Sequence, residues 1–60
     1  MNKFLFHMNQ AVKIAVSGEE GVVVGRAEYD TAENNYFVRY RSADGRAIEQ
    51  WWSESALLAA

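Results

Sequence analysis

The sequence predicts a single small all-β domain of the SH3-like barrel type, with about five short strands and one short helical turn before the last strand. Three observations predict this fold. Apolar and polar residues alternate in several short segments, which is the period of a half-buried strand. Turn-forming glycines and asparagines separate those segments. The chain has only 60 residues, which is near the lower limit for one hydrophobic core, so one domain is expected.

The composition narrows the classes of protein. Half of the residues are apolar and 13% are aromatic, so the chain has enough apolar surface to fold. It contains no cysteine, and therefore neither a disulfide nor a thiolate metal site can add stability, whereas self-association could. The formal net charge of −2 gives no general attraction to nucleic acid or anionic lipid, and we expect neither as a partner.

Residues 1–9 are expected to form an N-terminal arm, and residues 10–60 the barrel. The apolar group at 4–6 is far shorter than a signal-peptide core or a membrane span. Together with the absence of cysteine, it indicates a bacterial cytoplasm. Met8 is a second possible start, so residues 1–7 are expected to be dispensable.

Two strands are predicted in the first half of the chain. Residues 11–16 form the first strand because Val12, Ile14 and Val16 recur at every second position, and the glycines that follow allow a reversal. Residues 21–29 form the second strand, in which Gly25 indicates a bend or bulge.

The next segment, residues 30–35, is polar and is predicted to be a loop, with Asn34 and Asn35 suited to a left-handed conformation. The third strand is Tyr36 to Arg41, which is rich in β-branched and aromatic residues.

A hairpin is predicted at Asp44-Gly45, because this dipeptide suits a turn with positive φ. It joins the third strand to a fourth at Arg46 to Trp52. Ser53 can then cap a helical turn through Ser55, and Leu57 and Leu58 complete the chain as a short last strand.

Catalytic chemistry has little support in the residues. His7 is the only histidine, and it has no cysteine or second histidine with which to bind a transition metal. Glu19 and Glu20 lie side by side in a turn and are best explained as a charged turn tip. No serine has a nearby histidine base, and no glycine-rich phosphate loop is present. We expect no catalytic residues, no metal and no cofactor.

The aromatic residues of the third and fourth strands are more informative. Trp51 and Trp52 are adjacent, so in a regular strand they point to opposite faces. One can enter the core of so small a barrel, which leaves the other exposed as an anchor for a ligand, a partner or a second copy.

Tyr36, Val38 and Tyr40 are expected on one face of the third strand, and Phe37, Arg39 and Arg41 on the other. Arginine beside aromatic rings suits peptide, nucleotide or carboxylate recognition, although ordinary solvated arginines beside core aromatics are equally consistent with the pattern. The predicted binding residues are Trp51, Trp52, Gln50, Tyr36 and Arg39.

Several segments resemble the plasmid-borne type II dihydrofolate reductases. Residues 6–12 are similar to that family's Phe-x-Met-Gly-x-x-Val run, with Asn9 in place of the glycine, and residues 21–25 are similar to its Gly-x-Ile-Val-Gly. The family's Val-Gln-Ile-Tyr motif corresponds to residues 49–52, Glu-Gln-Trp-Trp, in which Gln50 is shared. The resemblance implies an SH3-like barrel that assembles into a tetramer around a pore, with NADPH as cofactor and Gln50 orienting the substrate.

The chain also looks similar to short proteins of temperate bacteriophages and prophages, on the segments Gly25 to Tyr29 and Glu49 to Trp52. That resemblance implies origin and fold. The leading hypothesis is therefore a phage-type binding module that self-associates and binds a small ligand or a host protein through an aromatic and arginine surface. One alternative is the NADPH-dependent reductase. The other is a nucleic-acid-binding barrel that uses the arginines Arg26, Arg39, Arg41 and Arg46.

Overall fold

The protein is all-β, as its sequence predicts. A computed structural model describes residues 3–60 and contains one antiparallel sheet of five strands, in the order β4-β3-β2-β1-β5. A single 3₁₀ turn, η1, precedes the last strand. The elements are β1 (Ala11–Ile14), β2 (Glu20–Ala27), β3 (Asn35–Arg41), β4 (Ala47–Ser53), η1 (Glu54–Ala56) and β5 (Leu57–Ala59).

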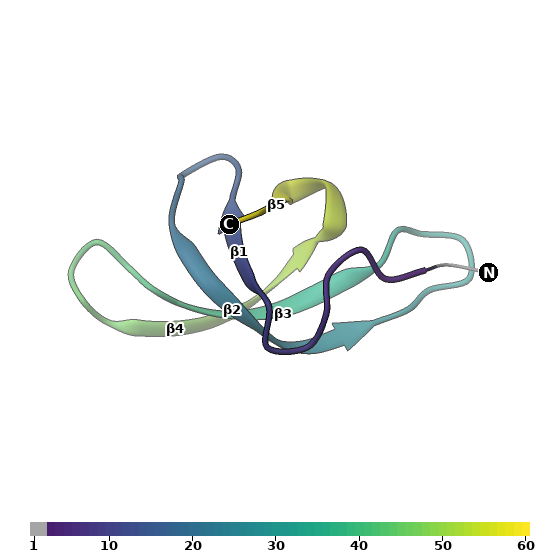
Figure 1. The fold of residues 1–60 in the computed structure, drawn as a ribbon, viewed down its shortest axis with the longest axis horizontal. Coiled ribbons are helices and arrows are strands. Elements are labelled where there is room, and N and C mark those ends of the chain that lie inside the picture. Colours follow the sequence, from purple (N-terminus) through teal and green to yellow (C-terminus); the bar gives the residue numbers. More distant parts are fainter. Residues whose placement is uncertain (1–2) are drawn as a thin grey trace.

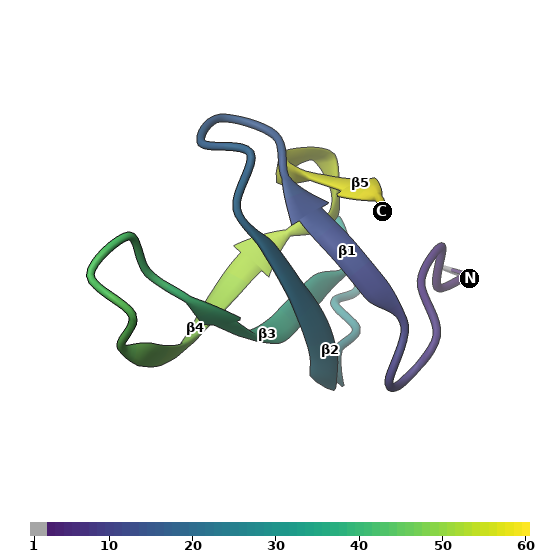
Figure 2. The same cartoon turned by 60° about the vertical axis from the view of Figure 1, so that its left-hand side comes forward.

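The sheet curls so that its inner face encloses the core, and its two edges, β4 and β5, are joined by η1 (Figure 1). The turn between β3 and β4 projects at one end of the molecule. The N-terminal segment lies at the other end, beside the connection from β2 to β3. This projection of the hairpin away from β1 and β5 is also clear in Figure 2. The molecule is consequently elongated, with extents of 38 × 18 × 16 Å.

The first strand is shorter than its alternating pattern predicts. It ends at Ile14, and Val16 lies in the following turn with 86% of its surface exposed. The turn begins early because Gly18, at φ +78°, donates its N–H to the Ile14 carbonyl at 2.7 Å. This local hydrogen bond, and not the alternation of apolar residues, therefore determines where β1 ends.

The predicted irregularity in β2 is confirmed. The pairing of β2 with β3 shifts register between Val23 and Gly25, which leaves Val24 as the extra residue of a bulge. Gly21, nearby in β2, has no room for a side chain, because a Cβ there would lie 2.5 Å from the Arg39 carbonyl oxygen. Glycine thus lets β2 and β3 approach closely where the sheet bends.

The β3–β4 hairpin forms around Asp44-Gly45, as expected, through a three-residue loop. Gly45 has φ +86° and donates its N–H to the Ser42 carbonyl at 2.9 Å. A type I turn followed by a left-handed glycine is a common hairpin connection of this length. Asp44 accepts hydrogen bonds from the Ser42 hydroxyl and the Arg46 N–H, and these bonds lower the pKa of its carboxyl.

Two sequence expectations about loop residues are wrong. Asn34 and Asn35 are not left-handed: Asn35 belongs to β3, and Asn34 is buried with its side-chain amide donating to the Lys3 carbonyl at 3.0 Å. Among the described residues, Asn9 is the only non-glycine with positive φ, at 68°.

The cap of η1 also differs from its prediction. Ser53 occupies the N-cap position, but its hydroxyl makes no capping hydrogen bond. The carboxylate of Glu33 acts instead, because it accepts from the Ser55 N–H at 2.8 Å and from the Ser55 hydroxyl at 3.0 Å. A side chain 22 positions away thus satisfies the start of the turn.

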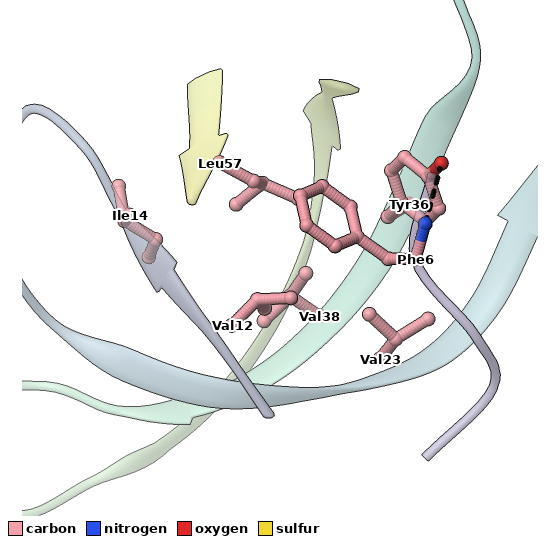
Figure 3. Close-up of a cluster of buried hydrophobic side chains, with 7 residues drawn as sticks. All are labelled: Phe6, Val12, Ile14, Val23, Tyr36, Val38 and Leu57. Carbon is pink, nitrogen blue, oxygen red and sulfur yellow. Dashed lines mark hydrogen bonds between the residues drawn. The ribbon is translucent and has the colours of Figure 1, made fainter. Parts of the chain in front are cut away.

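The core lies between the curled strands (Figure 3). Its centre includes a residue of the N-terminal segment, since Phe6 is only 2% exposed and its ring packs edge-on against Tyr36 at 5.2 Å between centroids. The buried apolar residues are Phe6, Val12, Ile14, Val23, Tyr36, Val38 and Leu57. Phe6, one of the residues expected to be dispensable, therefore belongs to the core; Met1 and Asn2 lie outside the described residues.

Candidate functional site

Strands β3 and β4 present their side chains to opposite faces, as the sequence predicts. Tyr36 pairs with Trp52 on the inner face, and Phe37 pairs with Trp51 on the outer face. Trp51 is 48% exposed, whereas Trp52 packs against the core. The two adjacent indoles are thus separated by the sheet, and Trp51 is the outer one.

The outer face carries a small aromatic surface. The rings of Phe37 and Trp51 lie 5.0 Å apart with an interplanar angle of 38°, which is within the range of favourable aromatic pairs. Gly25 lies opposite Phe37 on β2, and a Cβ there would approach the Phe37 Cβ to 3.1 Å. Glycine at this position therefore leaves space for the Phe37 ring over β2.

An ion pair borders these rings. Arg39 pairs with Glu49 across the strands, and its guanidinium lies 2.6 Å and 2.7 Å from one carboxylate oxygen through Nη2 and Nε. The two side chains are 61% and 41% exposed, so water screens the pair and its contribution to stability is about 0–1 kcal/mol. We call Phe37, Trp51, Arg39 and Glu49 the outer patch.

The inner face of the hairpin carries a second aromatic group. Trp52 and Tyr40 contact edge to face, with ring centroids 6.3 Å apart. The Tyr40 hydroxyl donates to the side-chain oxygen of Gln50 at 3.2 Å, at the exposed end of this face. The indole N–H of Trp52 is buried and has no hydrogen-bond partner among residues 3–60. Gln50 and Trp52 thus lie on the face opposite to Trp51.

Tyr36 is fully buried and has a structural role. Its hydroxyl donates to the Glu54 carboxylate and accepts from the Leu5 N–H at 2.9 Å. It also accepts from the Phe6 N–H at 3.3 Å, so it joins the N-terminal segment to η1. Burial, followed by the hydrogen bond to Glu54, raises the pKa of Tyr36. In this position Tyr36 cannot touch a partner outside the domain.

The five predicted binding residues therefore divide into three places. Trp51 and Arg39 are in the outer patch, Gln50 and Trp52 are on the inner face, and Tyr36 is in the core. Sequence reasoning did not include Glu49 in the site. The predicted hairpin could have found it, because a pairing of Phe37 with Trp51 also sets Arg39 opposite Glu49.

The four arginines do not share one surface. The Arg26 guanidinium lies 4.3 Å above the Phe4 ring and Nη1 donates to the Phe6 carbonyl at 3.5 Å, while Arg39 is paired with Glu49. Arg41 and Arg46 are exposed near the hairpin turn. This distribution does not form the continuous basic stripe expected of a nucleic-acid interface.

Metal-binding clusters and membrane-spanning helices are both absent from the described residues. Between residues 3 and 60, no group of three or more histidine, cysteine, aspartate or glutamate side chains could hold a metal ion. No helix in that range has the length and apolar character needed to cross a membrane. Compared with models of protein families and with curated proteins, the chain matches none of them.

Proposed function

We propose that the protein is a small binding module of the kind encoded by temperate phages and prophages, which self-associates and binds a protein or small-molecule partner through the outer patch. The observation that carries this proposal is the position of Trp51. Half of its surface faces water on the outer side of the sheet, where its ring lies against that of Phe37 at a tilt. Large exposed aromatic residues beside arginine are enriched at protein interfaces.

Small size supports self-association. Among residues 3–60, seven apolar residues are buried in the core, and the chain lacks cysteine. Domains of this size hide only about 60% of the surface that their unfolded chain exposes, and association is one way to bury more. Covering Trp51 and Phe37 adds apolar burial without changing the fold of the protomer.

The outer patch is chemically suited to a partner with both apolar and polar groups. Arg39 and Glu49 neutralise each other, so the patch carries no net charge beside its two rings. Such a surface does not select polyanions. It suits another protein surface, including a second copy of this chain, or a planar ligand that stacks on the indole.

The test compares Trp51→Ala with Leu58→Ala, a control because Leu58 is 54% exposed on the separate edge strand β5. Sedimentation velocity across a range of protein concentrations measures the association of each variant. We expect the wild type to associate, Trp51→Ala to raise the dissociation constant by about 30-fold or more, and Leu58→Ala to have little effect. An unchanged dissociation constant for Trp51→Ala would contradict the proposal.

A second candidate is a reductase of the type II dihydrofolate reductase kind, favoured by one observation. Gln50, the residue shared with that family's motif, is exposed at the inner face and could reach a ligand in a shared pore. This candidate requires a tetramer and NADPH-dependent turnover of dihydrofolate. Absence of turnover at protein concentrations where the assembly forms would eliminate it.

A further inference from the structure

Strand β4 is an edge of the sheet, and only one side of its backbone is used. Its ladder with β3 ends in two backbone hydrogen bonds: Ser42 N–H to the Arg46 carbonyl and Glu54 N–H to the Asn34 carbonyl, both 2.9 Å. Hydrogen-bonded pairs alternate with non-bonded pairs in an antiparallel ladder. The even-numbered residues of β4 therefore bond to β3, and the odd-numbered residues direct their N–H and C=O groups away from the sheet.

These outward backbone groups coincide with the outer patch. Glu49 and Trp51 are both odd-numbered, and within residues 3–60 no hydrogen bond reaches their outward N–H or C=O groups. The edge thus presents donors and acceptors directly beside a half-exposed indole. Most natural sheets protect such an edge with proline, lysine or a covering loop. Strand β4 contains neither proline nor lysine.

We infer that two copies of this chain associate by antiparallel pairing of their β4 strands, around a two-fold axis that passes between Trp51 of one copy and Trp51 of the other. This inference rests on the self-association in the proposed function and names its interface. Antiparallel edge pairing about a two-fold axis is self-complementary, so the same groups are satisfied in both copies. It also keeps the two outer faces on the same side of a continuous ten-stranded sheet, since each copy contributes five strands.

The backbone pattern restricts the possible alignments. Outward groups can bond only to outward groups, so an odd-numbered residue must face an odd-numbered residue of the second copy. Alignments that pair at least three outward residues of β4 from each copy place the two-fold axis at Glu49, at Gln50 or at Trp51. These alignments place Glu49 opposite Glu49, Glu49 opposite Trp51, or Trp51 opposite Trp51, respectively.

Side-chain chemistry selects among these three alignments. Like charges directly opposite each other destabilise a strand pair, which disfavours an axis at Glu49. An axis at Gln50 sets each indole against a carboxylate that is already paired with Arg39. An axis at Trp51 brings the two indoles together and extends each Phe37–Trp51 ring pair into a row of four rings. This alignment buries the most aromatic surface.

The first test uses proline to block single outward N–H groups. Proline is tolerated on an edge strand where its missing N–H faces solvent, so both Glu49→Pro and the control Ala47→Pro keep the ladder to β3. In the inferred alignment Glu49 pairs with Ser53 of the second copy, whereas Ala47 lies beyond the paired strands. We expect Glu49→Pro to raise the dimer dissociation constant about 30-fold, with Ala47→Pro within about threefold of wild type.

The second test reads the alignment directly on the wild-type protein. In a mixed sample of isotope-labelled and unlabelled chains, an intermolecular contact between the Hα protons of Gln50 and Trp52 is expected, because these residues form the non-bonded pairs beside the axis. The amides of Glu49 and Trp51 should also exchange more slowly in the dimer. Intermolecular contacts of Gln50 with Gln50 or with Ile48 would overturn the alignment.

The outcomes separate the two proposals. If the wild type dimerises and Trp51→Ala weakens the dimer, but Glu49→Pro does not and no intermolecular Hα contact is found, the outer patch associates face to face and edge pairing is wrong. If the wild type is a monomer at every concentration, the self-association in the proposed function fails, and edge pairing fails with it.

Discussion

Strands β1 and β4 differ in how far their side chains are buried. Strand β1 has four residues, of which Val12 and Ile14 are completely buried. Strand β4 has seven residues and none of them is buried. The difference arises because β1 lies between β2 and β5, while β4 has β3 on only one side. Strand β1 therefore supplies two fully buried side chains to the core, whereas β4 leaves Trp51 and one side of its backbone exposed.

The largest expected effect concerns the contact of the N-terminal segment with the core. Phe6→Ala removes a ring that is 2% exposed, so the free energy of unfolding should fall by about 3–5 kcal/mol. Leu5→Ala, at the neighbouring residue with 64% exposure, should cost less than about 0.5 kcal/mol. Urea denaturation followed by tryptophan fluorescence measures both variants. Equal effects would mean that the N-terminal segment does not belong to the core.

The next largest effect is expected where β4 contacts the core. Trp52 contributes to the core from β4, so Trp52→Ala should lower the free energy of unfolding by about 2–3 kcal/mol. The comparison variant is Ile48→Ala on the same face, nearer the hairpin turn, for which about 1 kcal/mol is expected. Thermal unfolding monitored by circular dichroism is suitable. A larger loss at Ile48 would place the stabilising part of the hairpin at its projecting end.

A smaller effect concerns the link from the N-terminal segment to η1. Tyr36→Phe removes the hydroxyl that contacts Glu54 and Leu5, at a cost of about 1.5–2 kcal/mol at neutral pH. Because the folded-state pKa of Tyr36 is raised, its stabilising contribution is complete below the unfolded pKa of about 10. That contribution is lost as the pH rises from there through the folded-state value.

The measurement is the free energy of unfolding between pH 8 and pH 11, obtained from urea titrations. Wild-type stability should fall with pH above about 10 more steeply than the stability of Tyr36→Phe. Parallel curves for the two proteins would show that Tyr36 keeps the same proton affinity after unfolding.

The smallest effect concerns the cap of η1, the turn that connects the hairpin to β5. Glu33→Ala removes both hydrogen bonds to Ser55 and should cost about 0.5–1 kcal/mol. Ser53→Ala should cost less than about 0.3 kcal/mol, since the Ser53 hydroxyl caps nothing. Chemical denaturation of both variants side by side decides the point. A larger cost for Ser53→Ala would restore the sequence-based assignment of the cap.

The sequence alone determined the number of strands, the single turn before β5, the bulge near Gly25 and the opposite orientation of Trp51 and Trp52. These features follow from local chemistry: an alternating period fixes which side chains share a face, and glycine permits conformations and approaches that other residues do not. Each depends on residues that are close together in the chain.

Only the tertiary structure decided which indole is exposed, that Tyr36 is buried, that Phe6 belongs to the core and that Glu33 caps η1. These outcomes depend on contacts between residues far apart in sequence, such as the hydrogen bonds from Leu5 and Phe6 to the Tyr36 hydroxyl. A period of two assigns residues to two faces of a strand, but it cannot say which face the rest of the chain will cover.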